Sequence, residues 1–180
     1  MSMLIQSGLK ILAREGYEFL IDEGIDKART FAEMINNEPD FELITRPELN
    51  ILTYRFCPAE VQQALAAATP DQSEKINTCL NRITKFIQKT QRERGKAFVS
   101  RTRLEPARHG RFPCIVFRVV LANPLTTSDI LTNILAEQKE LAKEPDIQDE
   151  IAILNQMADA VLEQEQSDVK SGERSGIKQA

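Results

Sequence analysis

A single arginine interrupts an apolar run that alternates like a β-strand. The run PCIVFRVVLANPLTT covers residues 113–127, and Arg118 stands near its middle. Alternate residues of a strand share a face, so Arg118 lies with four small or apolar neighbours: Cys114, Val116, Val120 and Ala122. The opposite face then carries Ile115, Phe117, Val119 and Leu121.

A guanidinium group cannot be taken out of water without a partner, so Arg118 needs an explanation. One interpretation is a structural ion pair, or an arginine at a strand end whose head group reaches solvent. The other is an arginine held on a rigid strand to bind an anion, for which a carboxylate is the natural ligand. The spacing of the residues leaves both interpretations open.

The other reactive side chains form no catalytic pattern. His109 is the only histidine, and its surroundings are rich in proline, arginine and glycine, so we expect a solvent-exposed loop histidine. No serine, cysteine and histidine are arranged as a nucleophilic triad. Cys57, Cys79 and Cys114 are far apart within apolar runs, which is typical of small buried side chains in a reducing compartment. We therefore expect a cytoplasmic protein with neither catalytic residues nor a metal site in this chain.

Three further arginines stand in predicted strands. Arg55 follows Tyr54, and Arg101 and Arg103 flank Thr102. We interpret these arginines as surface or inter-domain ion-pairing residues rather than as substrate ligands.

Composition excludes several classes of protein. The 180 residues fit one domain, and a net charge of −4 with a pI near 5.2 argues against nucleic-acid binding. No stretch approaches the roughly 20 apolar residues of a membrane helix, and the first residues lack the pattern of a signal peptide.

The periodicity predicts an α+β fold, with a small, mostly antiparallel sheet and helices packed on one face. Strands are expected at 41–45, 50–57, 96–104 and around Arg118. Helices are expected at 4–36 (weakened at Gly16), 59–68, 70–94 and 127–141, and a further helix within 143–165. Thr69 and Gln72 predict a capping box and Gly95 a helix end, whereas Thr126 is the expected cap of the fourth helix. Residues 166–180 are expected to be a disordered tail.

Two blocks have a more specific pattern: PELNILTYRFCP at 47–58 and VFRVVLANPLTT at 116–127. Together with GYEFLIDEGIDKARTFAEMI (16–35) and IQKTQRERGKAFVSRTRL (87–104), they resemble the C-terminal small domain of the group II pyridoxal-phosphate-dependent amino-acid decarboxylases. Within that family, they resemble most the bacterial pyridoxal-dependent aspartate 1-decarboxylases, with glutamate decarboxylase as a near relative. The resemblance assigns residues 1–142, with their leading helix, to the small domain of a fold type I enzyme.

The resemblance also implies what this chain lacks. In the family, a lysine in a His-Lys pair binds pyridoxal phosphate covalently, but Gly110 follows the only histidine of this chain. The cofactor is thus implied for the complete enzyme, and its binding residues are not in this chain. The resemblance implies a fragment of a carboxy-lyase, inactive alone, whose partners are the large cofactor-binding domain and a second subunit of a homodimer.

By the same resemblance, Arg118 matches a strand arginine that holds a substrate carboxylate in the glutamate enzymes. Aspartate, converted to β-alanine, is the favoured substrate, and glutamate is next. Leu4, Ile5, Leu9 and Leu12 are candidates for the surface that meets the rest of the enzyme. The alternative is a non-catalytic interaction module that pairs with a separately encoded large domain.

Overall fold

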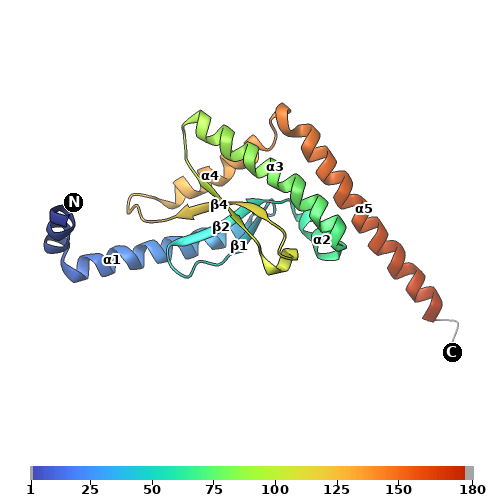
Figure 1. Cartoon of the computed structure of the whole chain (residues 1–180), viewed down its shortest axis with the longest axis horizontal. Coiled ribbons are helices and arrows are strands. Elements are labelled where there is room, and N and C mark those ends of the chain that lie inside the picture. Colours follow the sequence, from blue (N-terminus) through green and yellow to red (C-terminus); the bar gives the residue numbers. More distant parts are fainter. Residues whose placement is uncertain (1, 177–180) are drawn as a thin grey trace.

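A four-stranded antiparallel sheet in the order β1-β2-β4-β3 organises the chain (Figure 1). The computed structural model describes residues 2–176, with side chains described for residues 7, 8 and 10–167. The strands are β1 (Phe41–Thr45), β2 (Ile51–Phe56), β3 (Ser100–Leu104) and β4 (Cys114–Val120). The helices are α1 (Ser2–Asn37), α2 (Ala59–Ala67), α3 (Pro70–Arg94), the short η1 (Ala107–His109), α4 (Ser128–Leu141) and α5 (Pro145–Gly176).

The helix ends follow from local capping chemistry. The Thr69 side chain accepts a hydrogen bond from the Gln72 backbone, and the Gln72 side chain accepts one from the Thr69 backbone, so the predicted capping box of α3 is confirmed. Gly95 ends α3 with a φ of 68°, the left-handed conformation that glycine adopts without strain. Helix α4 is capped by Thr127, whose side chain accepts from the Ile130 backbone. The expectation that Thr126 is the cap was wrong by one residue.

Helix α1 changes direction at Ala13, three residues before Gly16, where we expected the helix to be weakened. Ala13 has a φ of 53° and a ψ of −172°, which breaks the helical path between two helical pieces. Gly16 stays helical because a glycine weakens a helix by only about 1 kcal/mol relative to alanine. Of the four leucine and isoleucine candidates for an interaction surface near this end, Leu12 is 41 % exposed. The side chains of Leu4, Ile5 and Leu9 lie outside the described residues.

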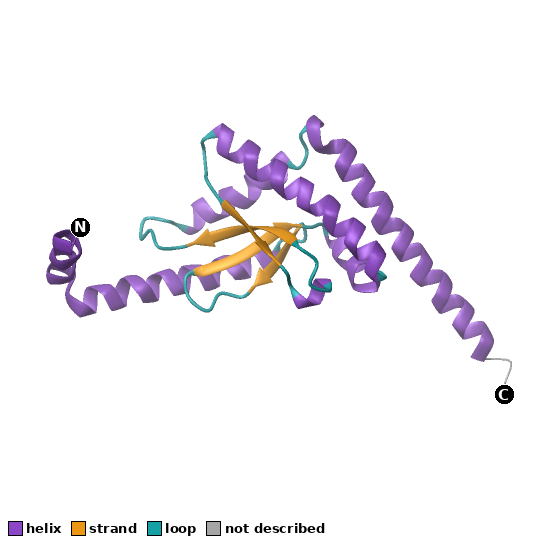
Figure 2. Cartoon of the chain, viewed as in Figure 1, coloured by secondary structure: helices purple, strands orange, loops and turns teal. Residues whose placement is uncertain are grey.

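One face of the sheet is covered by helices around Tyr54. Its ring is fully buried, and its centroid lies 5.5 Å from that of Phe31 in α1 and 5.2 Å from that of Phe117 in β4. The Tyr54 hydroxyl donates to Gln138 of α4 at 3.0 Å, and Gln138 donates to Gln91 of α3 at 3.2 Å. Helices α1, α3 and α4 therefore meet on the Tyr54 face, and the predicted α+β layer is confirmed (Figure 2).

Helix α5 packs on α2 and α3 through its first half and then extends away from the sheet (Figure 1). Leu154, Ala158 and Val161 are its buried contacts. The helix continues to Gly176, past residue 165, where we expected helix to give way to disorder. The division of the chain at residue 142 stays a prediction.

Gly24 lets α1 pass close to the segment that follows β4. A Cβ atom at this position would lie 2.8 Å from the Leu121 backbone oxygen and 3.3 Å from the Cβ of Asn50. We expect Gly24→Ala to lower the free energy of unfolding by about 1–3 kcal/mol, because neither backbone can yield without strain. Chemical unfolding followed by circular dichroism measures this effect.

Gly8→Ala is the matched control for this prediction. A Cβ at Gly8, on the same helix, meets only the end of the flexible Tyr17 side chain, at 3.1 Å. We expect this variant to be at least as stable as the parent, since alanine favours a helix over glycine by about 1 kcal/mol. Equal gains in stability for both substitutions would show that the close approach at Gly24 has no energetic weight.

Candidate functional site on the open face of the sheet

The register of the strands places Arg118 in the middle of the face opposite Tyr54, which we call the open face. Arg118 is paired with Thr53 of β2 on one side and with Ser100 of β3 on the other. Thr45 of β1 is paired with Thr53, and residues paired across antiparallel strands share a face. These four residues, Thr45, Thr53, Arg118 and Ser100, form a row across the sheet that we call the Arg118 row.

Two further rows flank the Arg118 row on the same face. On one side, Ile51 is paired with Val120, so that row is apolar. On the other side, Glu42 is paired with Arg55, and Thr102 with Val116, which makes a row with two charged groups. The side chain of Arg118 thus stands between an exposed apolar row and a charged row in which Arg55 and Val116 are fully buried.

Arg118 is exposed, and its guanidinium group has no hydrogen bond or ion pair with any described residue. The neighbouring hydroxyl groups are already engaged: those of Thr45 and Thr53 bond each other at 2.8 Å. The Ser100 hydroxyl donates to the Arg118 backbone oxygen at 2.7 Å. Within the described part of the chain, a structural ion pair for Arg118 is therefore ruled out. Its role in binding an anion stays a prediction.

The buried arginine of this sheet is Arg55, and the prediction that it lies at the surface or between domains was wrong. Its side chain is fully buried, and its Nε donates to Glu42 Oε2 at 2.7 Å. Its Nη1 donates to Asn77 Oδ1 in α3 at 2.7 Å. Arg55 does form an ion pair, as predicted, but a buried one. Its guanidinium is bound by this chain and has no access to a ligand.

His109 is buried as well, and the expectation of a solvent-exposed histidine was wrong. Its Nε2 lies 2.9 Å from Glu42 Oε1 and 3.2 Å from Arg55 Nη2. A guanidinium only donates and an ionised carboxylate only accepts, so one ring nitrogen cannot bond both. The shorter distance and the negative charge select Glu42, and His109 Nε2 therefore carries a proton.

Glu42 is the centre of this cluster, and our reading of the sequence did not single it out. Besides Arg55 and His109, its carboxylate meets Arg108 Nε at 3.3 Å, and Arg108 also donates to the Leu43 backbone oxygen. Burial alone would raise the pKa of Glu42, but the His109 hydrogen bond and the charges of Arg55 and Arg108 lower it to about 2. The cluster holds η1 against the charged row of the sheet.

The cysteines are free and buried, as predicted. Burial raises the pKa of the Cys57 thiol to about 12 and also raises that of Cys114, so both stay protonated at neutral pH. Within the described side chains, no group of three or more His, Cys, Asp and Glu residues is placed to hold a metal ion. No helix within residues 2–176 combines the length and apolar character needed to cross a bilayer.

Arg101 and Arg103 of the edge strand β3 lie on the Tyr54 side of the sheet, since Arg101 is paired with Phe117. Both are exposed, and Arg103 forms an ion pair with Glu105 at 3.2 Å. The prediction of surface ion pairing is confirmed for Arg103. Ser100 and Thr102 lie on the Arg118 face, half-buried.

The comparisons with known proteins agree with this architecture. No family model matches the chain. It is 52 % identical over 162 residues to an aspartate 1-decarboxylase of Aliivibrio fischeri, covering 90 % of this chain and 29 % of that protein. The chain is thus similar to one part of a group II pyridoxal-phosphate-dependent amino-acid decarboxylase. An aromatic-L-amino-acid decarboxylase of Bacillus atrophaeus is 28 % identical over 138 residues, which is 77 % of this chain and 25 % of that protein.

Solved structures support the fold. Mouse CSAD in its apo form has a TM-score of 0.62 at 23 % identity, over 76 % of this chain and 26 % of that one. Oryza sativa TDC with PLP and tryptamine has a TM-score of 0.54 at 15 % identity, over 75 % of this chain and 25 % of that one. The chain therefore shares the fold of one part of these fold type I structures, and it spans less than a third of the length of the relatives it matches.

Pyridoxal phosphate is the cofactor expected for the complete enzyme, and its binding by residues outside this chain stays a prediction. The paired residues of the open face include no lysine, and Gly110 follows the only histidine. The open face presents the Arg118 guanidinium, which suits a carboxylate, and its paired residues offer no amine for covalent attachment of the cofactor.

Proposed function

We propose that this chain is the C-terminal small domain of a pyridoxal-phosphate-dependent decarboxylase of an acidic amino acid, and that Arg118 binds a carboxylate of the substrate. The observation that carries the proposal is the exposed Arg118 guanidinium, unpartnered among the described residues, on a strand paired on both sides. Pairing on both sides fixes the backbone, so the planar fork of the guanidinium can meet both carboxylate oxygens at once.

The charges around Arg118 favour an external anion. Glu42 is the one carboxylate among the paired residues of the open face, and Arg55, Arg108 and His109 already occupy it. Among the paired residues of this face, Arg118 is thus left without a neutralising group. A substrate carboxylate is the partner that such an uncompensated guanidinium binds best.

Aspartate is the substrate we favour, with β-alanine as product, and glutamate is the second choice. The support is the 52 % identity to a protein named aspartate 1-decarboxylase. The large domain of the enzyme would supply the cofactor, and a second subunit would complete a homodimer in the cytoplasm. The part described here would position the substrate and carry out no chemistry by itself.

A chimaeric decarboxylase tests the proposed function. In this enzyme the present chain replaces the 162 matching residues of the Aliivibrio fischeri protein. We expect it to bind pyridoxal phosphate and to release carbon dioxide from aspartate faster than from glutamate. A chimaera that folds and binds the cofactor, yet decarboxylates neither amino acid, would favour the non-catalytic module instead.

The isolated chain is expected to form no covalent adduct with pyridoxal phosphate at a defined lysine, because the family's His-Lys pair is missing. The chain is incubated with the cofactor, reduced with borohydride and mapped by mass spectrometry. Adducts should be scattered and substoichiometric. One stoichiometric lysine adduct, together with carbon dioxide release from aspartate, would overturn the division of labour proposed here.

A further inference from the structure

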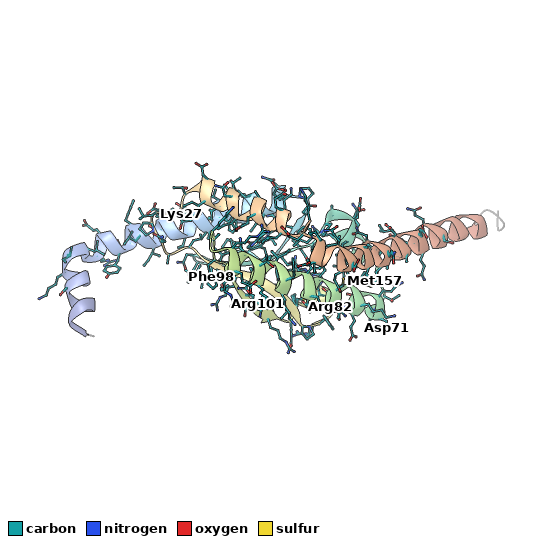
Figure 3. The ribbon with its side chains drawn as sticks, turned by 90° about the horizontal axis from the view of Figure 1, so that it is seen from above. Lys27, Asp71, Arg82, Phe98, Arg101 and Met157 are labelled. Atoms are coloured by element: carbon teal, nitrogen blue, oxygen red, sulfur yellow. The ribbon has the colours of Figure 1, made fainter. Side chains whose placement is uncertain are left out.

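A cavity of about 570 Å³ lies between α4 and the segment that leads from α3 to β3. Three apolar side chains line it: Ala97 of that segment, and Ile130 and Ile134 of α4. Figure 3 labels Phe98, the neighbour of Ala97, near one end of α3 and Asp71 near the other, which locates the cavity along this helix. The volume is typical of sites for small molecules, which combine an apolar wall with a few polar groups.

The wall of the cavity also carries charged side chains, namely Arg94, Lys96, Glu137 and Glu140. Two of them are neutralised by residues outside the lining, since Arg94 pairs with Glu144, and Glu140 pairs with Lys143 at 2.8 Å. The ammonium group of Lys96 is exposed and has no ion pair with any described residue. A positive charge of the wall is therefore available to a ligand.

Glu137 supplies a negative charge that its neighbours satisfy only in part. Its Oε2 accepts a hydrogen bond from Gln91 Nε2 at 2.9 Å. Its Oε1 is buried and accepts no hydrogen bond from any described residue. A buried carboxylate oxygen without a donor is unfavourable, so a ligand that brings a donor gains from meeting it.

A chain of buried side chains explains why Glu137 stands here and why one oxygen is left over. A carboxylate only accepts, so Gln91 must turn its amide nitrogen toward Glu137, and its oxygen then accepts from Gln138. The oxygen of Gln138 accepts in turn from the Tyr54 hydroxyl. This chain uses Oε2 alone. Its structural role therefore leaves Oε1 for another donor.

We propose that the cavity binds a free amino acid with an aliphatic side chain, whose ammonium group donates to Glu137 and whose carboxylate accepts from Lys96. Such a ligand carries one charge of each sign, which matches the two charges that the wall leaves unpaired. The terminal torsion of a glutamate side chain is soft, so Oε1 can turn to the ligand while Gln91 holds Oε2. The aliphatic side chain would lie on the apolar wall. Because α3 and α4 lie on the Tyr54 face, opposite Arg118, the inference does not depend on the proposed function.

Titration of the 180-residue chain with L-leucine tests the proposal, followed by calorimetry and by the NMR signals of side-chain amides. We expect binding at one site, with shifts of the amide signals of Gln91 and Gln138. Isoamylamine lacks the carboxylate of leucine, and 4-methylpentanoate lacks its ammonium group. Each analogue should bind at least about tenfold more weakly, which is the loss for one charge-assisted hydrogen bond.

Two pairs of matched variants identify the residues that bind the ligand. Glu137→Gln and Lys96→Met should each weaken leucine binding roughly tenfold or more. Glu140→Gln should not, because Glu140 lines the same cavity but already pairs with Lys143. Lys85→Met, which removes another exposed lysine of α3, should not either. Since Lys96 is exposed, Lys96→Met keeps the fold and tests the site even if Glu137→Gln disturbs the buried amides.

Several results would overturn the proposal. They are a lack of leucine binding, equal affinity for leucine and both analogues, or unchanged affinity in Lys96→Met. A further one is a ligand-free Lys96→Met chain that melts as early as Glu137→Gln, because the lysine would then pair with Glu137 directly and leave no charge for a ligand.

Discussion

Arg118→Lys in the chimaeric decarboxylase is expected to lower kcat/KM for aspartate. The fall should correspond to a loss of about 2–5 kcal/mol of transition-state stabilisation, the range for losing one partner of a desolvated charge pair. Lysine keeps the positive charge but replaces a planar fork with a single ammonium group, so the two parallel hydrogen bonds to a carboxylate are lost. The large effect of a nominally conservative change is the signature of bidentate binding. Steady-state kinetics with aspartate and with glutamate measure it.

The melting temperature separates carboxylate binding by Arg118 from a structural role of this residue. Arg118 is exposed and its guanidinium bonds no described residue, so Arg118→Lys and Arg118→Met should leave the melting temperature of the isolated chain unchanged. Cofactor absorbance in the chimaera should also be preserved. Arg103→Lys is the control, since Arg103 is another exposed strand arginine, and its ion pair among the described residues is with Glu105. Near-normal kinetics in a well-folded Arg118→Met enzyme would end the carboxylate hypothesis.

Glu42→Gln is expected to destabilise the isolated chain by about 3–5 kcal/mol, the cost of leaving a buried charge without its partner. Arg55 is fully buried, and its Nε lies 2.7 Å from Glu42 Oε2, so the neutral amide leaves a positive charge uncompensated in the interior. The substitution keeps the size and shape of the side chain, which removes packing as a cause. Urea unfolding of both proteins gives the difference.

Glu105→Gln serves as the control for Glu42→Gln. Its partner Arg103 is exposed, and such surface pairs contribute about 0–1 kcal/mol. If both glutamine variants lose the same small amount of stability, the cluster around Glu42 has no special weight. In that case, the burial of Arg55 must be supported by its other hydrogen bonds, to Asn77 and Cys114.

The lowered pKa of Glu42 predicts how the free energy of unfolding depends on pH. The pKa of Glu42 falls from an ordinary value of 4.5 to about 2 on folding. A depressed pKa contributes stability that is fully present above about pH 4.5 and is lost as the pH falls toward 2. At 1.36 kcal/mol per unit of pKa the contribution is about 3 kcal/mol. Unfolding measured across this range should show the loss in the parent chain and a flatter profile in Glu42→Gln.

Local sequence was enough to predict where the helices and strands lie and which face of its strand Arg118 shares. The alternation around Arg118 depends only on the geometry of an extended chain, so Cys114 and Val116 were correctly placed on its face. The capping box at Thr69 and the glycine stop at Gly95 are likewise made by residues within one helical turn of each other. Such features follow from the sequence because neighbours along the chain supply every contact they need.

Tertiary structure alone decided which arginine is buried and which is free. Arg55 and Arg118 both stand in strands between apolar residues, and the local pattern treats them alike. Arg55 is buried because η1 and α3 bring His109 and Asn77 onto it from 54 and 22 residues away. Arg118 is exposed because no described helix or loop covers its row. Burial depends on contacts between segments distant in sequence, and the period of a strand carries no information about which segments will meet it.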